Sequence, residues 1–183
     1  MLLINNLRGE LERLFQRSVR TEAGTAGIAQ QAGTVPYRLT EQGHEVLLVT
    51  SRGSGRWVLP KGWLAAGESL VQSAARESYE EAGVIGVVEP VELGRFLATK
   101  IRMEISTAHV VVIYPLRVEL ELADWPERQL RRRQWWSLSE ASLIMADHQR
   151  GMLGALERSV QRTHGEAELR APSEAHRRLR ARG

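Results

Sequence analysis

The stretch GWLAAGESLVQSAARESYEEAGV, residues 62–84, decides the fold of this chain. Ser69 followed by Gln72 three residues later is a capping box, which starts a helix. The run that follows holds good helix formers and no proline, and Gly83 suits the left-handed position that ends a helix. The stretch therefore predicts a helix over residues 69–82.

One face of the predicted helix carries small residues, so it can lie close against a sheet. Another face gathers Glu77, Glu80 and Glu81 within about 100° of one another. Carboxylates at this spacing repel each other, by about 0.2–0.5 kcal/mol per pair. A solvated acidic face is one interpretation. The other is a Mg²⁺ or Mn²⁺ site, because these ions prefer oxygen ligands. Arg76 lies one turn before Glu80 and can orient the Glu80 carboxylate.

The fixed spacing continues outside the helix. In the pattern G-x5-E-x7-R-E-x-x-E-E-x-G-V the fixed positions are Gly62, Glu68, Arg76, Glu77, Glu80, Glu81, Gly83 and Val84. With this pattern the chain resembles the Nudix hydrolases, whose sequence box has these residues in this order. Ser78 departs from the box, where an aliphatic residue is usual. This departure costs some packing but touches no metal ligand.

The resemblance implies a metal-dependent hydrolase of pyrophosphate bonds, with Mg²⁺ or Mn²⁺ as the cofactor and a phosphorylated small molecule as the substrate. Glu77, Glu80 and Glu81 would hold the metal together with the backbone carbonyl of Lys61. Arg76 would orient the glutamates, and Glu68 would steady the loop that enters the helix. Divalent ions neutralise phosphate charge, lower the pKa of a bound water and hold the attacking and leaving oxygens.

A general base outside the box is also implied by analogy with parts of the family. Glu127 lies on a loop before Trp135 and Trp136, which is where such a glutamate occurs. A solvated loop glutamate is the alternative interpretation. Glu104 and Glu121 are weaker candidates for the same role.

The flanking sequence is similar to one branch of the family. TSRGSGRWVLPKG (residues 50–62) and ELGRF (residues 92–96) resemble the diphosphoinositol polyphosphate phosphohydrolases, a branch that also cleaves diadenosine polyphosphates. Such substrates are densely phosphorylated, so basic residues near the box are candidate phosphate ligands, although each can equally serve solubility. The candidates are Arg38, Arg52, Arg56, Lys61 and Lys100.

Three aromatic or imidazole side chains lie close to these motifs. Trp57 and Trp63 can stack on a base, but a tryptophan beside an apolar strand is more often part of the core. His109 lies on an apolar strand, which favours a core or edge histidine over a ligand.

Other functions stay open. A non-catalytic nucleotide- or RNA-binding module would keep the fold. Nudix modules that have lost activity usually lack some of the box carboxylates, whereas this chain has all of them. Within the enzymes, an RNA 5′-pyrophosphohydrolase and an ADP-ribose hydrolase are rivals. From residue 161 onward, arginines exceed glutamates by three, which equals the net charge of +3 of the whole chain. The rest of the chain is therefore close to neutral. A surface built to coat nucleic acid is therefore not indicated.

The chain is expected to form one α/β domain, a Nudix-type α/β/α sandwich with a mixed β-sheet. Residues 1–22 predict an amphipathic helix, residues 23–160 the Nudix domain, and residues 161–183 an arginine-rich, disordered tail. The strands are expected near residues 28–39, 45–50, 57–60, 86–99, 108–120 and 133–138, with Pro36 against a central place for the first. Helices follow Ser139.

The chain has no cysteine and no apolar run long enough to cross a bilayer, and because its first residues lack the apolar stretch of a signal peptide, none is expected. We therefore expect a cytoplasmic protein, and a homodimer is possible.

Overall fold

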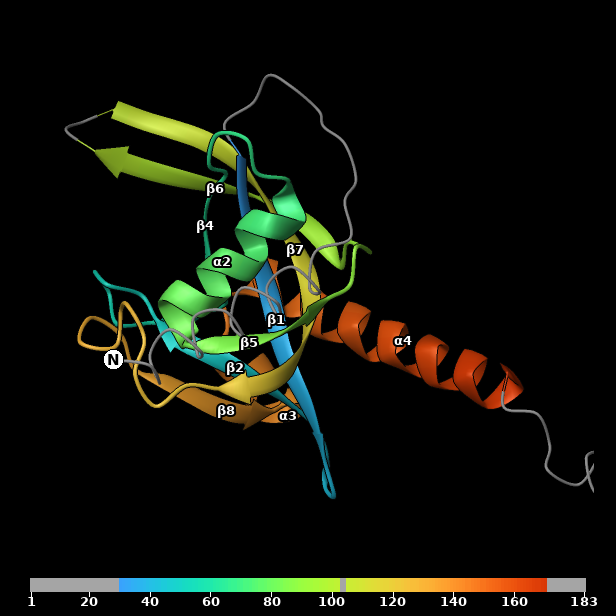
Figure 1. Ribbon diagram of the computed structural model, residues 1–183. Helices are drawn as coiled ribbons and strands as arrows, with labels where there is room; N and C mark the ends of the chain where they lie inside the picture. Colours follow the sequence, from blue (N-terminus) through green and yellow to red (C-terminus); the bar gives the residue numbers. More distant parts are fainter. Residues whose placement is uncertain (1–29, 103–104, 171–183) are drawn as a thin grey trace, which may run out of the picture.

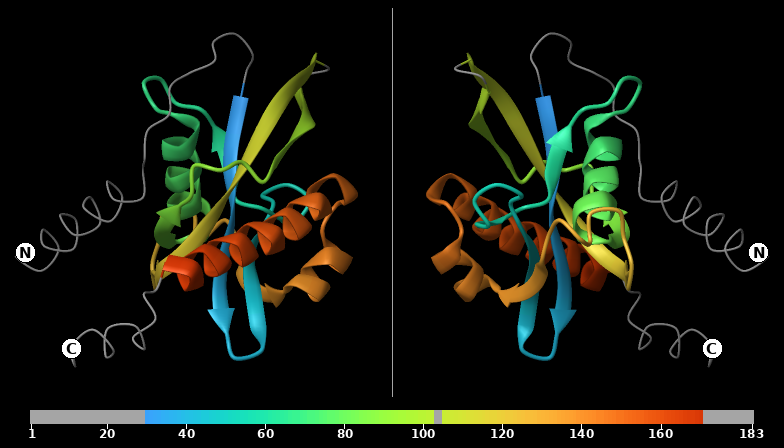
Figure 2. Two further views of the ribbon diagram at one scale, coloured as in Figure 1. Left: turned by 90° about the vertical axis from the view of Figure 1, so that its right-hand side faces the viewer. Right: turned by 90° about the vertical axis from the view of Figure 1, so that its left-hand side faces the viewer.

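The computed structural model describes residues 30–102 and 105–170 of the 183-residue chain (Figure 1). The helix predicted over residues 1–22 lies outside the described residues, as do Glu104 and residues 171–183. In the described part, one mixed β-sheet has helices on both faces, which confirms the predicted α/β/α sandwich (Figure 2). No helix in this part is long and apolar enough to span a membrane.

Eight strands form the sheet in the described part of the chain. They are β1 (Gln30–Thr40), β2 (Gly43–Thr50), β3 (Trp57–Val58), β4 (Lys61–Trp63), β5 (Val84–Val88), β6 (Gly94–Arg102), β7 (Ile105–Glu121) and β8 (Arg133–Ser137). The main path runs β3–β2–β1–β7–β5, and β4 pairs with β1, β6 with β7 and β8 with β2. Strands β1 and β7 are parallel, whereas the other pairs are antiparallel.

The core has two layers, one on each face of the sheet. Along β2, Leu47 and Val49 pack with the helix α2 (Leu70–Ala82), while Val46 and Leu48 pack with α3 (Leu138–Ile144) and α4 (Asp147–Arg170). All four side chains are fully buried. Successive side chains of a strand point to opposite faces, so one apolar strand serves both layers.

Two hairpins contribute strands to the sheet. Val49 pairs with Val58 and Thr50 with Trp57 across the turn between β2 and β3. Strands β6 and β7 form a second, long hairpin whose register runs to the pair Arg102–Ile105. The expected strand region after the helix divides into β5 and β6, and Pro90 lies between these two strands.

Strand β1 is central, contrary to the expectation from Pro36. Proline lacks the N–H that a ladder needs. On one side β1 pairs with β4 at residues 31–33 and with β2 at residues 37–40. Pro36 therefore falls in the gap between two partner strands, where the missing donor costs no ladder hydrogen bond.

Helix α2 has the ends that its sequence predicts. The Ser69 hydroxyl accepts a hydrogen bond from the Gln72 N–H at 3.2 Å, and the Gln72 side chain accepts one from the Ser69 N–H at 2.7 Å. This is the predicted capping box. Gly83 ends the helix in the left-handed region, with φ 62° and ψ 34°.

The departure at Ser78 is accommodated by a hydroxyl partner on β1. The two hydroxyl oxygens of Ser78 and Thr34 lie 2.7 Å apart, and both residues are fully buried. Because the Ser78 hydroxyl donates to the carbonyl of Ala74 at 2.8 Å, Thr34 is the donor of the pair. Ser78 thus holds α2 on the sheet through a hydrogen bond.

Two expectations for the C-terminal part were wrong. The N-cap of α3 is Ser137 rather than Ser139, because Ser137 and Glu140 form a capping box. Helix α4 continues through residue 160, where the disordered tail was expected to begin, and reaches Arg170. Arginine, glutamate and alanine are good helix formers even without an apolar stripe, which explains the longer helix.

Candidate active site

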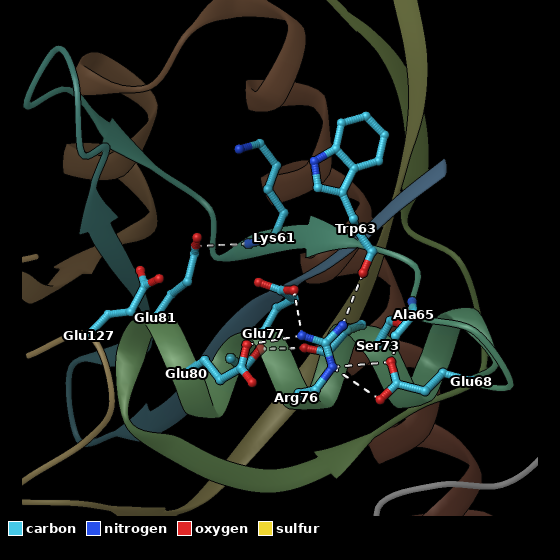
Figure 3. Close-up of polar contacts among 12 residues, drawn as sticks. Lys61, Trp63, Ala65, Glu68, Ser73, Arg76, Glu77, Glu80, Glu81 and Glu127 are labelled. Atoms are coloured by element: carbon cyan, nitrogen blue, oxygen red, sulfur yellow. Dashed lines mark hydrogen bonds and ion pairs between the residues drawn. The ribbon is translucent and has the colours of Figure 1, made fainter. Parts of the chain in front are cut away.

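Arg76 holds the acidic residues of the box together (Figure 3). Its Nε donates to the Glu68 carboxylate oxygens at 3.0 and 3.1 Å. Its Nη1 donates to Glu77 at 2.7 Å and to Glu80 at 3.0 Å. Its Nη2 donates to the backbone carbonyl of Trp63 at 3.0 Å, which ties α2 to β4. Arg76 is therefore placed as an orienter of glutamates, as the resemblance implies.

Glu68 lies at the junction between the loop and the helix. Besides binding Arg76, it accepts a hydrogen bond from the Ser73 hydroxyl at 2.5 Å. That hydroxyl accepts one from the Ala65 N–H at 3.4 Å. These contacts hold the loop onto the first turns of α2, which fits the steadying role expected for Glu68.

Glu81 is buried and is held by two elements. One of its oxygens accepts the Lys61 N–H at 3.1 Å, and the other accepts a hydrogen bond from Arg131. Arg131 is buried as well, and it also donates to the Thr50 carbonyl at 2.9 Å and to Glu127 at 2.5 Å. One arginine thereby connects the box helix to Glu127, the glutamate expected near the box.

The three box glutamates differ in exposure. The side chains of Glu77 and Glu81 are 12% and 7% exposed, whereas that of Glu80 is 38% exposed. The Glu77 carboxylate lies against Gly62, where an added Cβ would collide with it. Burial raises the pKa of Glu77, and burial raises the pKa of Glu81 to about 7 against the opposing effect of Arg131. Two of the three carboxylates, those of Glu77 and Glu81, are therefore withdrawn from solvent, and only that of Glu80 is exposed.

A cavity of about 370 Å³ adjoins this cluster beside the loop between β2 and β3. Arg131, which binds Glu81, also lines the cavity. Arg52 lies on its wall and donates to Glu127 at 3.3 Å. The arginines that line the cavity are Arg52, Arg128, Arg131 and Arg132.

The other basic candidates are dispersed. Arg38 lies toward the other end of β1, where it pairs with Glu45 at 2.6 Å and stacks on Trp135. The structure thus does not bring Arg38 to the box, because its strand position is set by the hairpin with β2. Arg56 is exposed on the loop between β2 and β3, and Lys100 lies on β6. The Lys61 backbone reaches Glu81, while its side chain extends away from α2 (Figure 3).

The aromatic candidates divide between core and surface. Trp57 is half-buried and meets Trp136 edge-on, with ring centroids 5.5 Å apart, so it belongs to the core. Trp63 is 37% exposed, and its ring lies on that of the buried His109, with centroids 4.6 Å apart. Glu121 pairs with Arg133 at 2.9 Å, so it takes no part in the acidic cluster.

The family model of the NUDIX domain matches residues 30–156. This chain belongs to the Nudix family. Nudix hydrolase 21, chloroplastic, of Arabidopsis thaliana is 41% identical over 122 residues, which cover 64% of this chain and 60% of the relative. Diphosphoinositol polyphosphate phosphohydrolase 3-alpha of Homo sapiens is 34% identical over 125 residues, covering 67% of this chain and 72% of the relative. The matched part of this Nudix chain thus spans 60% and 72% of the lengths of these two relatives.

A solved Ap4A hydrolase of C. elegans has a similar fold. Its TM-score is 0.54 at 20% sequence identity, and the match covers 73% of this chain and 99% of that one. A binary complex of that hydrolase gives a TM-score of 0.56 at 22% identity. These likenesses agree with the Nudix fold described above.

The Nudix box offers the type of ligand atom that a hard divalent cation prefers. Glu77, Glu80 and Glu81 offer carboxylate oxygens only, which Mg²⁺ and Mn²⁺ prefer. Gly62 leaves the Glu77 carboxylate room that a side chain would fill. No three such groups in the described residues converge closely enough to enclose an ion, and Arg76 and Arg131 bind their oxygens instead.

Sequence reasoning missed Arg131, Trp125 and Arg133. Trp125 and Arg131 lie on the loop before β8 and Arg133 is the first residue of β8, and the three consecutive arginines at this boundary were given no role. Arg131 is buried, which arginine rarely is unless it is paired, and here it pairs with Glu81 and Glu127. A run of arginines before a tryptophan pair was the one signal available.

The raised pKa of Glu81 predicts how stability depends on pH in the metal-free protein. The unfolded chain loses the Glu81 proton near pH 4.5, but the folded one keeps it to about pH 7. The contribution of Glu81 to the free energy of unfolding is therefore complete below pH 4.5 and is lost as pH rises to about 7. We expect urea unfolding with a chelator to show this loss for wild type and not for Glu81→Gln. The same pH profile for both proteins would contradict it.

Proposed function

We propose that this Nudix domain hydrolyses the pyrophosphate bond of a densely phosphorylated small molecule, of the diphosphoinositol polyphosphate or diadenosine polyphosphate type, with Mg²⁺ or Mn²⁺. One observation carries the proposal: Arg131 belongs both to the buried acidic cluster and to the arginine-lined cavity. An acidic cluster attracts cations, and a cavity with four arginines attracts phosphate groups. A substrate that extends from the acidic cluster into the cavity would need both the bound cations and the arginines.

The residues of the chain divide the work. Glu77, Glu80 and Glu81 would hold the metal ions, which lower the pKa of a water and balance phosphate charge. Arg76 keeps two of these carboxylates in place through hydrogen bonds of 2.7 and 3.0 Å. The cavity arginines would bind the phosphate groups that are not being cleaved.

Glu127 is the candidate general base, and arginines control its availability. Its two oxygens accept hydrogen bonds from Arg52 and Arg131. A phosphate group that binds these guanidinium groups competes with Glu127 for them. Substrate binding would thereby release the carboxylate to accept a proton from water.

The test is turnover with Mg²⁺ or Mn²⁺ on a panel of diphosphoinositol polyphosphates, diadenosine polyphosphates, ADP-ribose and 5′-triphosphorylated RNA. We expect the first two classes to give the highest kcat/KM, because they carry the most phosphate near the cleaved bond. Higher activity on ADP-ribose or RNA would contradict the substrate class. If no substrate of the panel is hydrolysed, the proposal that this domain is an active hydrolase is contradicted.

Arg52→Met should raise KM for these substrates about tenfold, because a charge-assisted contact to phosphate contributes about 1.5–3 kcal/mol. The matched control is Arg95→Met. Both side chains are exposed, at 61% and 57%, and each pairs with one glutamate, but Arg95 does not line the cavity. Steady-state kinetics of the two variants give the comparison. Equal KM values would remove Arg52 from substrate binding.

The cytoplasmic location and the possible homodimer stay predictions. Fluorescence microscopy of a tagged chain in its native cell would test the first, and sedimentation equilibrium would test the second.

A further inference from the structure

The C-terminal end of α2 is held by residues 122–133, which we call the clamp segment. The last carbonyls of a helix have no partner inside it. Here the carbonyls of Glu80, Glu81, Ala82 and Gly83 all accept hydrogen bonds from the clamp segment. Two of these bonds come from its backbone. The Glu127 N–H donates to the Glu80 carbonyl at 3.0 Å, and the Leu122 N–H donates to the Gly83 carbonyl at 2.8 Å.

Two side chains of the clamp segment supply the rest. The indole N–H of Trp125 donates to the Glu81 carbonyl at 3.2 Å. Arg133 donates through Nη1 to the carbonyls of Ala82 and Gly83, at 2.7 and 3.2 Å. The Arg133 guanidinium lies 4.0 Å from the centroid of the Trp125 ring, so each side chain fixes the other.

The clamp segment also carries the two residues that enter the acidic cluster. Glu127 donates its backbone N–H to α2 and directs its carboxylate to Arg131. Arg131 in turn binds the Glu81 carboxylate. Glu81 is therefore held twice by this segment, through its carbonyl by Trp125 and through its side chain by Arg131. A shift of the segment along the helix would move Glu81 and Glu127 relative to each other.

We propose that Trp125 and Arg133 are positioning residues that set the place of the Glu81 carboxylate, and with it the affinity of the box for a divalent ion. The inference rests on the proposed function for the identity of the ion. Neither side chain belongs to the box, and neither contacts its carboxylates. They act through the carbonyls of residues 81–83, in the manner of outer partners whose loss costs about 10–100-fold in metal affinity.

Trp125→Phe is the sharpest probe, because it removes the indole donor and keeps an aromatic face for Arg133. The matched control is Trp136→Phe on β8. Trp136 is also half-buried, but its indole nitrogen has no hydrogen-bond partner among the described residues, and it packs in the core layer of α3 and α4. A second probe, Arg133→Lys, keeps the charge and loses the forked contact with two carbonyls.

The readout is Mn²⁺ binding to each full-length variant, measured by the electron paramagnetic resonance signal of free Mn²⁺, with thermal unfolding in parallel. We expect Trp125→Phe and Arg133→Lys to raise the Kd for Mn²⁺ about tenfold. Trp136→Phe should leave the Kd within about twofold of wild type even where its Tm falls. In turnover assays, Trp125→Phe should lower kcat at a fixed Mn²⁺ concentration with little change in KM for substrate.

Equal Mn²⁺ affinity for wild type, Trp125→Phe and Arg133→Lys would overturn the inference, whatever the protein hydrolyses. So would an equal loss in Trp136→Phe, because the effect would then follow general stability. A wild type that binds Mn²⁺ with the expected differences among variants, but cleaves no diphosphate, would support the inference and contradict the proposed function. A wild type that binds no Mn²⁺ would contradict both.

Discussion

Glu80→Gln should lower kcat for pyrophosphate hydrolysis by at least about 100-fold, which is the upper end of what outer partners of a metal cost. Glutamine has nearly the same shape but no charge to hold a divalent ion. Stability should hardly change, because the Glu80 side chain is 38% exposed and, among the described residues, it pairs with Arg76 at 3.0 Å. Partly exposed pairs of this kind contribute about 0–1 kcal/mol. Steady-state kinetics and thermal unfolding measure the two quantities.

Glu92→Gln is the control for this prediction. Glu92 also pairs with one arginine, Arg95, at 2.5 Å, and its side chain is 32% exposed, but it lies between β5 and β6. It should keep wild-type kcat. If Glu80→Gln and Glu92→Gln turn over substrate equally, Glu80 holds no catalytic ion.

Gly62→Ala should abolish most activity while leaving the protein folded. An added Cβ would collide with the carboxylate of Glu77, which is the far end of a flexible side chain. The carboxylate can therefore turn away, and the cost to stability is limited to about 1–3 kcal/mol. We expect kcat to fall at least about 100-fold, because Glu77 leaves the place that Arg76 gives it. The Tm should fall by about 2–12 °C, at roughly 2–4 °C per kcal/mol.

Gly151→Ala separates this effect from the general effect of glycine replacement. Gly151 lies in α4, an added Cβ there meets nothing within 4 Å, and alanine favours a helix by about 1 kcal/mol. This variant should have a higher Tm and unchanged kcat. Full activity in Gly62→Ala would show that the position of the Glu77 carboxylate does not matter for catalysis.

Local signals in the sequence predicted the elements that carry the box. Ser69, Gln72 and Gly83 define both ends of α2, because caps depend on residues within one turn. The apolar run from Val46 to Val49 is equally local, and it predicts the strand that the structure shows as β2. The fixed spacing of the box also identified the family that the domain model confirms.

The sequence could not predict contacts made across long separations. Arg131 meets Glu81 from 50 residues away, and Trp125 meets the Glu81 carbonyl from 44. Only the sheet topology brings the loop before β8 to the end of α2. The same reason explains why the sequence contained no sign that Arg38 pairs with Glu45 and lies at the other end of β1.

The central claim is that Glu77, Glu80 and Glu81 hold divalent ions against a phosphate chain. The most direct measurement is the anomalous scattering of Mn²⁺ in crystals of the full chain grown with a non-hydrolysable diphosphate substrate analogue. The account predicts Mn²⁺ peaks among the carboxylates of these three residues, with Arg131 turned from Glu81 toward the phosphate groups. Bound analogue with no Mn²⁺ at these carboxylates, and with Arg76 and Arg131 still occupying them, would contradict it.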